Sequence, residues 1–179
     1  MSGDAGSWRG DEAALRRHLS ILAAAVRVEA FGNDYYLKMS ECVRDKEGKI
    51  ILESLAQDEV QHRAWLERQI DRIFPGRKVE DIEAATDYDL VPKKVFVPPK
   101  DGCLALEDEI KGLETAIEVE KRSARMYEEV SQEVADPELK GVLQRLARWE
   151  RGHQKILEDN LHYLKRGGSW YGYTPILDG

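Results

Sequence analysis

The chain has 179 residues, 34% of them charged and 42% hydrophobic, and a formal net charge of −7. This length suffices for one domain with a substantial core, and the acidic balance argues against a nucleic-acid-binding protein, which needs a basic face for the phosphates. The two cysteines, Cys42 and Cys103, form no CxxC pair, so a rubredoxin-type or zinc-ribbon site is excluded and both are expected to be reduced structural thiols.

The first predicted elements are two helices, over about residues 12–44 and 46–73. Apolar residues recur at helical spacing from Leu15 onward in the first helix, and Asp45 is a suitable N-cap for the second. No apolar run precedes them that could serve as a secretory signal, and no segment approaches the ~20 apolar residues of a membrane span. We therefore expect a cytoplasmic protein that does not bind membranes.

A long connection follows, over residues 74–102, where four prolines interrupt any helical pattern. We expect an ordered crossover, with a short helical turn near residues 79–85. Its length suggests that the helices on its two sides run parallel.

Two further helices are predicted over about residues 104–134 and 137–165. Asp136 and Pro137 are a typical N-cap and first helical residue for the last helix. The aromatic tail, residues 167–179, is too rich in apolar rings to be left in water. We expect it to dock on the bundle or across a dimer.

Together these elements predict an all-α fold. Two helical hairpins joined by one long crossover form a four-helix bundle of ferritin-like topology. We expect the whole chain, residues 1–179, to form this single domain.

The two hairpins are copies of each other, offset by 91 residues, so that Asp45 aligns with Asp136 without a gap in either hairpin. So many identities at one offset indicate a duplicated hairpin. The matched pairs include Ala25 and Ala116, Val28 and Val119, Glu29 and Glu120, Tyr36 and Tyr127, Leu52 and Leu143, Leu55 and Leu146, Glu59 and Glu150, His62 and His153, and Leu66 and Leu157.

The polar matches give each hairpin one Glu on its first helix and a Glu-x-x-His on its second. Glu29 and Glu59 lie 30 residues apart, as do Glu120 and Glu150. Each of these side chains shares a face with apolar residues, so the sequence directs four carboxylates and two imidazoles into the core. The candidate metal ligands are Glu29, Glu59, His62, Glu120, Glu150 and His153.

Four buried carboxylates without partners would cost more free energy than a marginally stable domain can offset, and they would protonate instead. Two divalent cations would neutralise them, and the two imidazoles would complete the ligand set. Carboxylate and imidazole ligands suit iron or manganese, with zinc also possible. We therefore predict a dinuclear site that holds two iron ions, with the ligand pattern of ferritin-like dinuclear carboxylate bundles.

The stretches AIEVEKRSARMYEEV and LARWERGHQKIL, with their counterparts VRVEAFGNDYYLKM and LAQDEVQHRAWL, resemble the rubrerythrin branch of the ferritin-like superfamily. The resemblance extends over residues 12–165. It implies a di-iron oxidoreductase whose ligands are the six residues named above. It also implies that Tyr36 and Tyr127 hydrogen-bond ligand carboxylates.

Two features depart from the family pattern. Rubrerythrins carry a four-cysteine rubredoxin site that delivers electrons, and this chain lacks the cysteines for one, so electrons would come from a separate donor protein. They also typically carry an extra Glu three residues after the third-helix ligand, where this chain has Ser123, with Gly32 as the counterpart in the first hairpin. In the family that Glu exchanges with a His as the redox state changes. The resemblance therefore implies the metal site more directly than a rubrerythrin-type peroxidase cycle.

Three functions stay open on the sequence. The first is an oxidoreductase that reacts with peroxide or dioxygen, working as a homodimer with an external electron-donor protein. The second is an iron-binding ferroxidase for iron storage or delivery. The third is a metal-binding helical bundle without catalysis.

Four residues near or outside the motif have no assigned role. Asp58 and Trp149 precede the two motif Glu residues and differ from each other, so packing and contact with the ligands are both open for them. His18 and His162 have no repeat partner and are expected to be ordinary surface or packing residues.

Overall fold

Four long helices make up the part of the chain that the computed structural model describes, residues 12–78 and 106–171, and no strand occurs in these ranges. Their ends differ from the predicted ones by at most two residues. The short turn predicted near residues 79–85 and Cys103 lie outside the described residues. The helices are α1 (Glu12–Cys42), α2 (Lys46–Ile73), α3 (Leu106–Glu133) and α4 (Pro137–Lys165).

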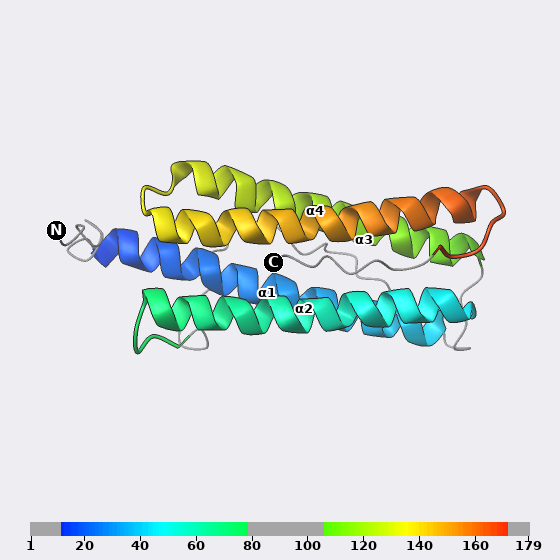
Figure 1. Cartoon of the computed structure of the whole chain (residues 1–179), viewed down its shortest axis with the longest axis horizontal. Helices are drawn as coiled ribbons and strands as arrows, with labels where there is room; N and C mark the ends of the chain where they lie inside the picture. Colours follow the sequence, from blue (N-terminus) through cyan, green and yellow to red (C-terminus); the bar gives the residue numbers. More distant parts are fainter. Residues whose placement is uncertain (1–11, 79–105, 172–179) are drawn as a thin grey trace.

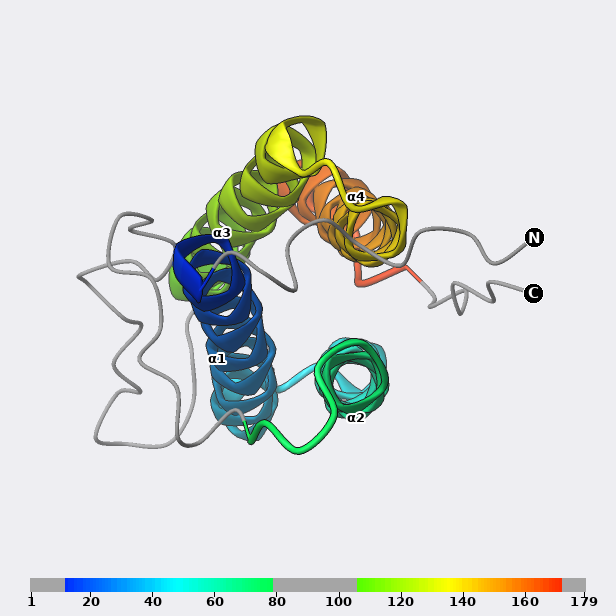
Figure 2. The same cartoon turned by 90° about the vertical axis from the view of Figure 1, so that its left-hand side faces the viewer.

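The helices form two antiparallel hairpins that pack face to face (Figure 1). Helix α1 packs along α2, α3 packs along α4, and α2 also contacts α4. Helices α2 and α3 run in the same direction, as the long connection suggested (Figure 1). Seen along the helices, one hairpin forms each layer of the bundle (Figure 2). The all-α, four-helix-bundle prediction is therefore confirmed.

The second helix of each hairpin begins with the same cap. The Asp45 carboxylate accepts hydrogen bonds from the backbone N–H groups of Glu47 and Gly48, at 2.8 and 3.0 Å. Asp136 does the same at the start of α4, where Pro137 is the first helical residue. Each cap satisfies donors that the helix leaves unpaired. Since the motif Glu follows its cap by 14 residues in both hairpins, both motifs lie about 21 Å along their helices.

The apolar core is divided into two clusters, with the polar motif residues between them along every helix. One cluster contains Leu22 and Val26 of α1 and Leu143 and Leu146 of α4, which precede the motif residues of those helices. The other contains Leu52 and Leu55 of α2, Leu113 of α3, and Leu157 of α4 beyond its motif. Because the helices alternate in direction, these segments stack into one apolar layer on each side of the motif residues. In the part of the chain that the structure describes, no helix is long and apolar enough to cross a bilayer.

The start of the aromatic tail docks on the chain's own bundle. The Trp170 side chain is 5% exposed, and its indole N–H donates to a Glu109 carboxylate oxygen at 3.2 Å. The ring lies over Gly48, where an added Cβ would come within 2.6 Å of it. The Tyr171 backbone N–H donates to Asn160 Oδ1 at 2.7 Å. Residues 172–179 of the predicted tail lie outside the described residues.

Replacing Gly48 by alanine tests this docking. The added methyl group collides with the Trp170 ring, so we expect Gly48→Ala to lower the free energy of unfolding by about 1–3 kcal/mol and to change the tryptophan fluorescence. Gly141→Ala is the matched control, since nothing lies within 4 Å of its Cβ position. Alanine should stabilise α4 there by about 0.5–1 kcal/mol. Equal stabilisation by both substitutions, measured by thermal unfolding, would contradict the contact.

Candidate metal centre

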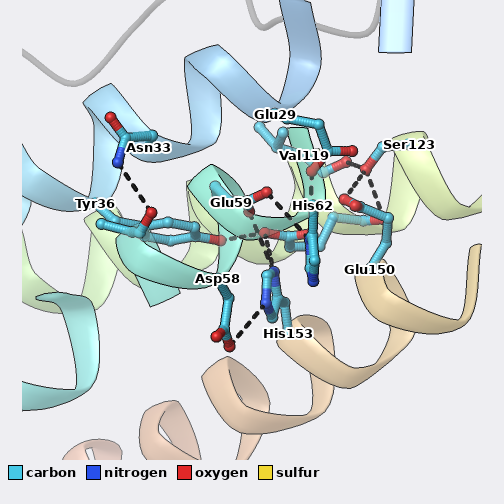
Figure 3. A network of polar contacts seen from close by, with 12 residues as sticks. Glu29, Asn33, Tyr36, Asp58, Glu59, His62, Val119, Ser123, Glu150 and His153 are labelled. Atoms are coloured by element: carbon cyan, nitrogen blue, oxygen red, sulfur yellow. Dashed lines mark hydrogen bonds and ion pairs between the residues drawn. The ribbon is translucent and has the colours of Figure 1, made fainter. Parts of the chain in front are cut away.

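The six predicted ligands meet in one buried layer at the middle of the bundle. Glu29 comes from α1 and Glu120 from α3, while α2 and α4 each contribute a Glu and a His one turn apart. None of the six residues is more than 8% exposed. The labelled side chains of this layer point toward one another (Figure 3). The fold thus brings together all six candidate ligands that the repeat identified.

Both imidazoles turn the same nitrogen toward the carboxylates. His62 Nδ1 lies 3.4 Å from Glu29 Oε2 and 3.6 Å from Glu59 Oε2. His153 Nδ1 lies 3.1 Å from Glu59 Oε1 and 3.7 Å from Glu120 Oε1. The two rings stack, with centroids 5.1 Å apart. Glu59 therefore offers one oxygen to each imidazole, which suits a carboxylate shared between two cations.

Six side-chain atoms of the ligand residues have no hydrogen-bond partner among the described residues; one is His153 Nε2, which lies near Asp58, and the other five face the middle of the layer. Buried polar atoms are almost always hydrogen-bonded, so a group of orphaned atoms in one layer calls for a ligand. All five are oxygen or nitrogen donors of the kind that bind iron, manganese or zinc. The atoms are Glu29 Oε2, Glu120 Oε2, Glu150 Oε1, His62 Nδ1 and His153 Nδ1.

Two overlapping sets of donors lie close enough to hold a cation each, with the donor atoms of a set all within 4.8 Å of one another. One set is Glu59, His62 and His153, and the other adds Glu29 and Glu150 to Glu59 and His62. Glu120 belongs to neither set, although its Oε2 atom is orphaned in the same layer. The donor set therefore fits a dinuclear centre, and the role of the six residues as ligands stays a prediction.

Burial dominates the electrostatics of the carboxylates. It raises the pKa of Glu29 to about 8, with the neighbouring Glu59 charge as the second cause. Burial likewise raises the pKa of Glu59, and it raises that of Glu150 well above its ordinary value. Burial would raise the pKa of Glu120 too, but its contacts with His153 outweigh this and lower it. Without cations, Glu29 therefore retains its proton near neutral pH, and Glu59 and Glu150 hold their protons to a higher pH than ordinary carboxyl groups do.

His153 responds to the same charges in the opposite sense. Burial alone would lower its pKa, but the Glu59 carboxylate, with Asp58 and Glu120, raises it well above the ordinary value. A cation that enters the layer would thus have to displace protons from the groups whose pKa is raised, so metal binding should release protons.

Two tyrosines reach across the bundle to Glu29 and Glu120, the single Glu that the first helix of each hairpin contributes (the lone Glu of that hairpin). The Tyr36 hydroxyl of α1 donates a short hydrogen bond to Glu120 Oε1 of α3. The Tyr127 hydroxyl of α3 donates to Glu29 Oε1 of α1 at 3.3 Å. Burial raises the pKa of both hydroxyls well above the ordinary value, so both stay protonated and remain donors. Each tyrosine therefore hydrogen-bonds a candidate ligand of the other hairpin, in line with what the family resemblance implied.

Ser123 and Gly32 contact the motif Glu of their own hairpin, a role that the sequence did not reveal. Ser123 Oγ donates to Glu150 Oε2 at 2.8 Å. At Gly32 an added Cβ would lie 2.8 Å from Glu59 Oε1, so the missing side chain leaves room for that carboxylate. Both residues follow the lone Glu of their hairpin by one helical turn, and this shared position is the sequence signal that could have indicated a contact with the site.

Asp58 and Trp149 both contact a ligand histidine of the opposite hairpin. Asp58 Oδ2 lies 3.5 Å from His153 Nε2. The Trp149 ring stacks on the His62 ring in parallel, with centroids 4.1 Å apart. Of the two alternatives that the sequence left open, Asp58 contacts a candidate ligand, and Trp149 both contacts one and packs in the apolar core.

The remaining singled-out residues lie elsewhere. His162 is close to Arg166 on the exposed side of α4, with 3.2 Å between His162 Nε2 and Arg166 Nη1. His18 belongs to neither donor set. Cys42 is buried at the end of α1.

The raised carboxyl pKa values predict that the metal-free protein loses stability as the pH rises. The folded chain keeps the Glu29 proton up to about pH 8, whereas the unfolded chain loses it near the ordinary value of 4.5. Stabilisation by that proton is present at low pH and disappears as the pH rises through the folded pKa. We expect the melting temperature of the metal-free protein to fall by at least about 4 °C from about pH 6 to about pH 9.

Two controls isolate the cause of that slope. Glu29→Gln removes one titrating proton and should flatten it, and cations that replace the protons should abolish it. A melting temperature that stays level or rises with pH in the metal-free protein would contradict the assigned pKa shifts.

Comparison with known proteins places the chain in a family. A family model described as rubrerythrin matches residues 20–161, which contain all six candidate ligands. None of the curated proteins matches. A hypothetical protein from Pyrococcus furiosus has a similar structure, with a TM-score of 0.68 and 22% identity over 90% of this chain and 98% of that one, which indicates a shared fold alone. Since the family match spans most of the chain and includes the whole buried Glu and His layer, this protein belongs to the rubrerythrin family.

Proposed function

We propose that this protein is a dinuclear iron-binding oxidoreductase that reacts with peroxide or dioxygen. The observation that carries the proposal is the set of orphaned carboxylate and imidazole atoms that converge in one buried layer. Family membership supports iron as the metal. The six ligands would hold two ferrous ions, and such a pair can supply two electrons to an O–O bond.

The residues around the ligands would prepare the site for this chemistry. Glu59 lies between the two imidazoles, where it can bridge two cations. Tyr36 and Tyr127 each fix one oxygen of a lone Glu, which leaves the other oxygen to face the layer. Apolar clusters on both sides would keep bulk water out. A dry, fixed ligand set strengthens every charge interaction inside it.

The electrons would come from another protein. The chain has two cysteines, so it cannot build the four-cysteine rubredoxin site of other rubrerythrins. We propose an external one-electron donor protein, a cytoplasmic location and a homodimer.

A second candidate, Fe(II) oxidation for iron storage or delivery, is favoured by Ser123. This residue stands where rubrerythrins typically carry an extra Glu, and its hydroxyl donates to Glu150. In rubrerythrins the carboxylate of that Glu exchanges with a histidine as the redox state changes. The neutral hydroxyl of Ser123 cannot act as such an anionic ligand. Size-exclusion chromatography separates the candidates, because a cage-sized assembly would favour storage and a dimer would favour the first proposal.

Removing the two lone Glu residues tests the metal centre itself. We expect Glu29→Ala combined with Glu120→Ala to reduce bound iron from about two ions per chain to near zero, because each cation loses a carboxylate ligand. Elemental analysis of protein from iron-supplemented cells measures this, and it also reveals zinc. The matched control is Glu41→Ala with Glu118→Ala, which removes exposed carboxylates from the same two helices. Iron retained at full stoichiometry in the first double variant would remove our ligand assignment.

Rapid mixing of the Fe(II)-loaded protein with an oxidant tests the reaction. We expect ferric absorbance to grow in with either oxidant, and faster with peroxide than with dioxygen if peroxide is the substrate. Stopped-flow absorbance in the near-ultraviolet measures both rates. If neither oxidant produces ferric absorbance while two iron ions remain bound, the protein is a metal-binding bundle without this activity.

A further inference from the structure

The residue before each motif Glu is the place where the two hairpins surround their ligand histidines differently. Asp58 and Trp149 occupy matched positions in the repeat. Each crosses to the opposite hairpin, where Asp58 approaches His153 and Trp149 covers His62. The six ligands are symmetric, and the groups behind the two imidazoles are not.

His153 has a carboxylate behind it. Its Nδ1 atom faces Glu59 and Glu120, and its Nε2 atom lies 3.5 Å from Asp58 Oδ2 (Figure 3). The His153 side chain is fully buried, so water is not available as a substitute acceptor. A carboxylate behind a metal-binding imidazole fixes its tautomer with the proton on the far nitrogen and makes the near nitrogen a stronger donor.

His62 has an indole behind it instead. Its ring and the Trp149 ring are parallel, so the indole covers the face of the imidazole and offers no hydrogen-bond acceptor in the imidazole plane. Both carboxylate contacts of His62 recorded for the described residues involve Nδ1. The Arg145 guanidinium lies 5.4 Å from the centroid of the Trp149 ring. The Trp149 ring that covers His62 thus has a positive charge beside it, whereas the Nε2 atom of His153 has a negative charge beside it.

We propose that the two halves of the centre bind divalent cations with unequal affinity, that the half with His153 fills first, and that Asp58 sets this order. Asp58 acts as a positioning residue, through His153 and without contact with the metal. The inference rests on the metal centre of the proposed function and not on any reaction with peroxide or dioxygen. A chain supplied with one equivalent of metal would thus hold it mainly beside His153.

Titration of the metal-free protein with Co(II) tests this, because cobalt binds the same donors and its visible bands report coordination. We expect calorimetry and absorbance to resolve two binding events. His153→Gln should remove the tighter event, whereas His62→Gln, which removes a donor of both sets, should weaken both events. Asp58→Asn keeps the size of the side chain and removes its charge, and we expect it to weaken the tighter event by about 10–100-fold and to leave the other nearly unchanged. Asp34→Asn, an exposed change on α1, is the control and should alter neither event.

The outcomes separate this inference from the proposed function. Two events of equal affinity, a tight event that survives His153→Gln, or an Asp58→Asn effect divided equally between both events would overturn the inference and leave the metal centre intact. Absence of any Co(II) or Fe(II) binding by the unaltered protein would overturn both. Because Asp58→Asn is isosteric and Asp58 is partly exposed, the variant should fold, and a circular dichroism spectrum of the metal-free form checks this.

Discussion

The mutual repulsion of four carboxylates in one buried layer is the constraint around which this bundle is arranged. Each carboxylate comes from a different helix, so no helix can shift without changing the distances within the layer. The repulsion can be relieved by protons or by cations. The pKa of Glu29, raised by burial first and by the neighbouring Glu59 charge second, reflects relief by a proton. Apolar clusters on both sides strengthen the effect by removing water. The same burial that destabilises the free carboxylates prepares them for metal.

Contacts between the hairpins converge on this layer. Tyr36 and Tyr127 each reach the lone Glu of the opposite hairpin, and Asp58 and Trp149 each reach the opposite histidine. One hairpin alone would therefore present ligands whose supporting groups are missing. Each copy of the duplicated unit thus supplies the side chains that support the candidate ligands of the other copy.

Much of the fold and the convergence of the six candidate ligands could be predicted because both leave periodic signals. The caps Asp45 and Asp136 mark helix starts, and the 91-residue offset identifies Glu59 and Glu150 as equivalents. Contacts across the bundle could not be predicted in the same way. Whether Trp149 packs on His62 depends on how two helices are rotated against each other, and spacing within one helix does not contain that information.

The docking of Trp170 was predictable only in part. A dense aromatic tail indicates that it must be buried somewhere, but its acceptor surface is Gly48, a residue without a side chain. An absent side chain carries no pattern in a single sequence. Ser123 illustrates the same limit, because its departure from the family was visible while its hydrogen bond to Glu150 required the structure.

Because of Gly32, the two hairpins differ in which amino-acid substitutions they can accept beside the motif Glu during evolution. Any side chain there would press on Glu59, the carboxylate that lies between both imidazoles. The matched position in the other hairpin already accommodates the Ser123 side chain. A lineage of this protein could therefore try new polar groups beside Glu150 while the surroundings of Glu59 stay fixed. Duplication made two equivalent halves, and steric room decides which of them is open to innovation.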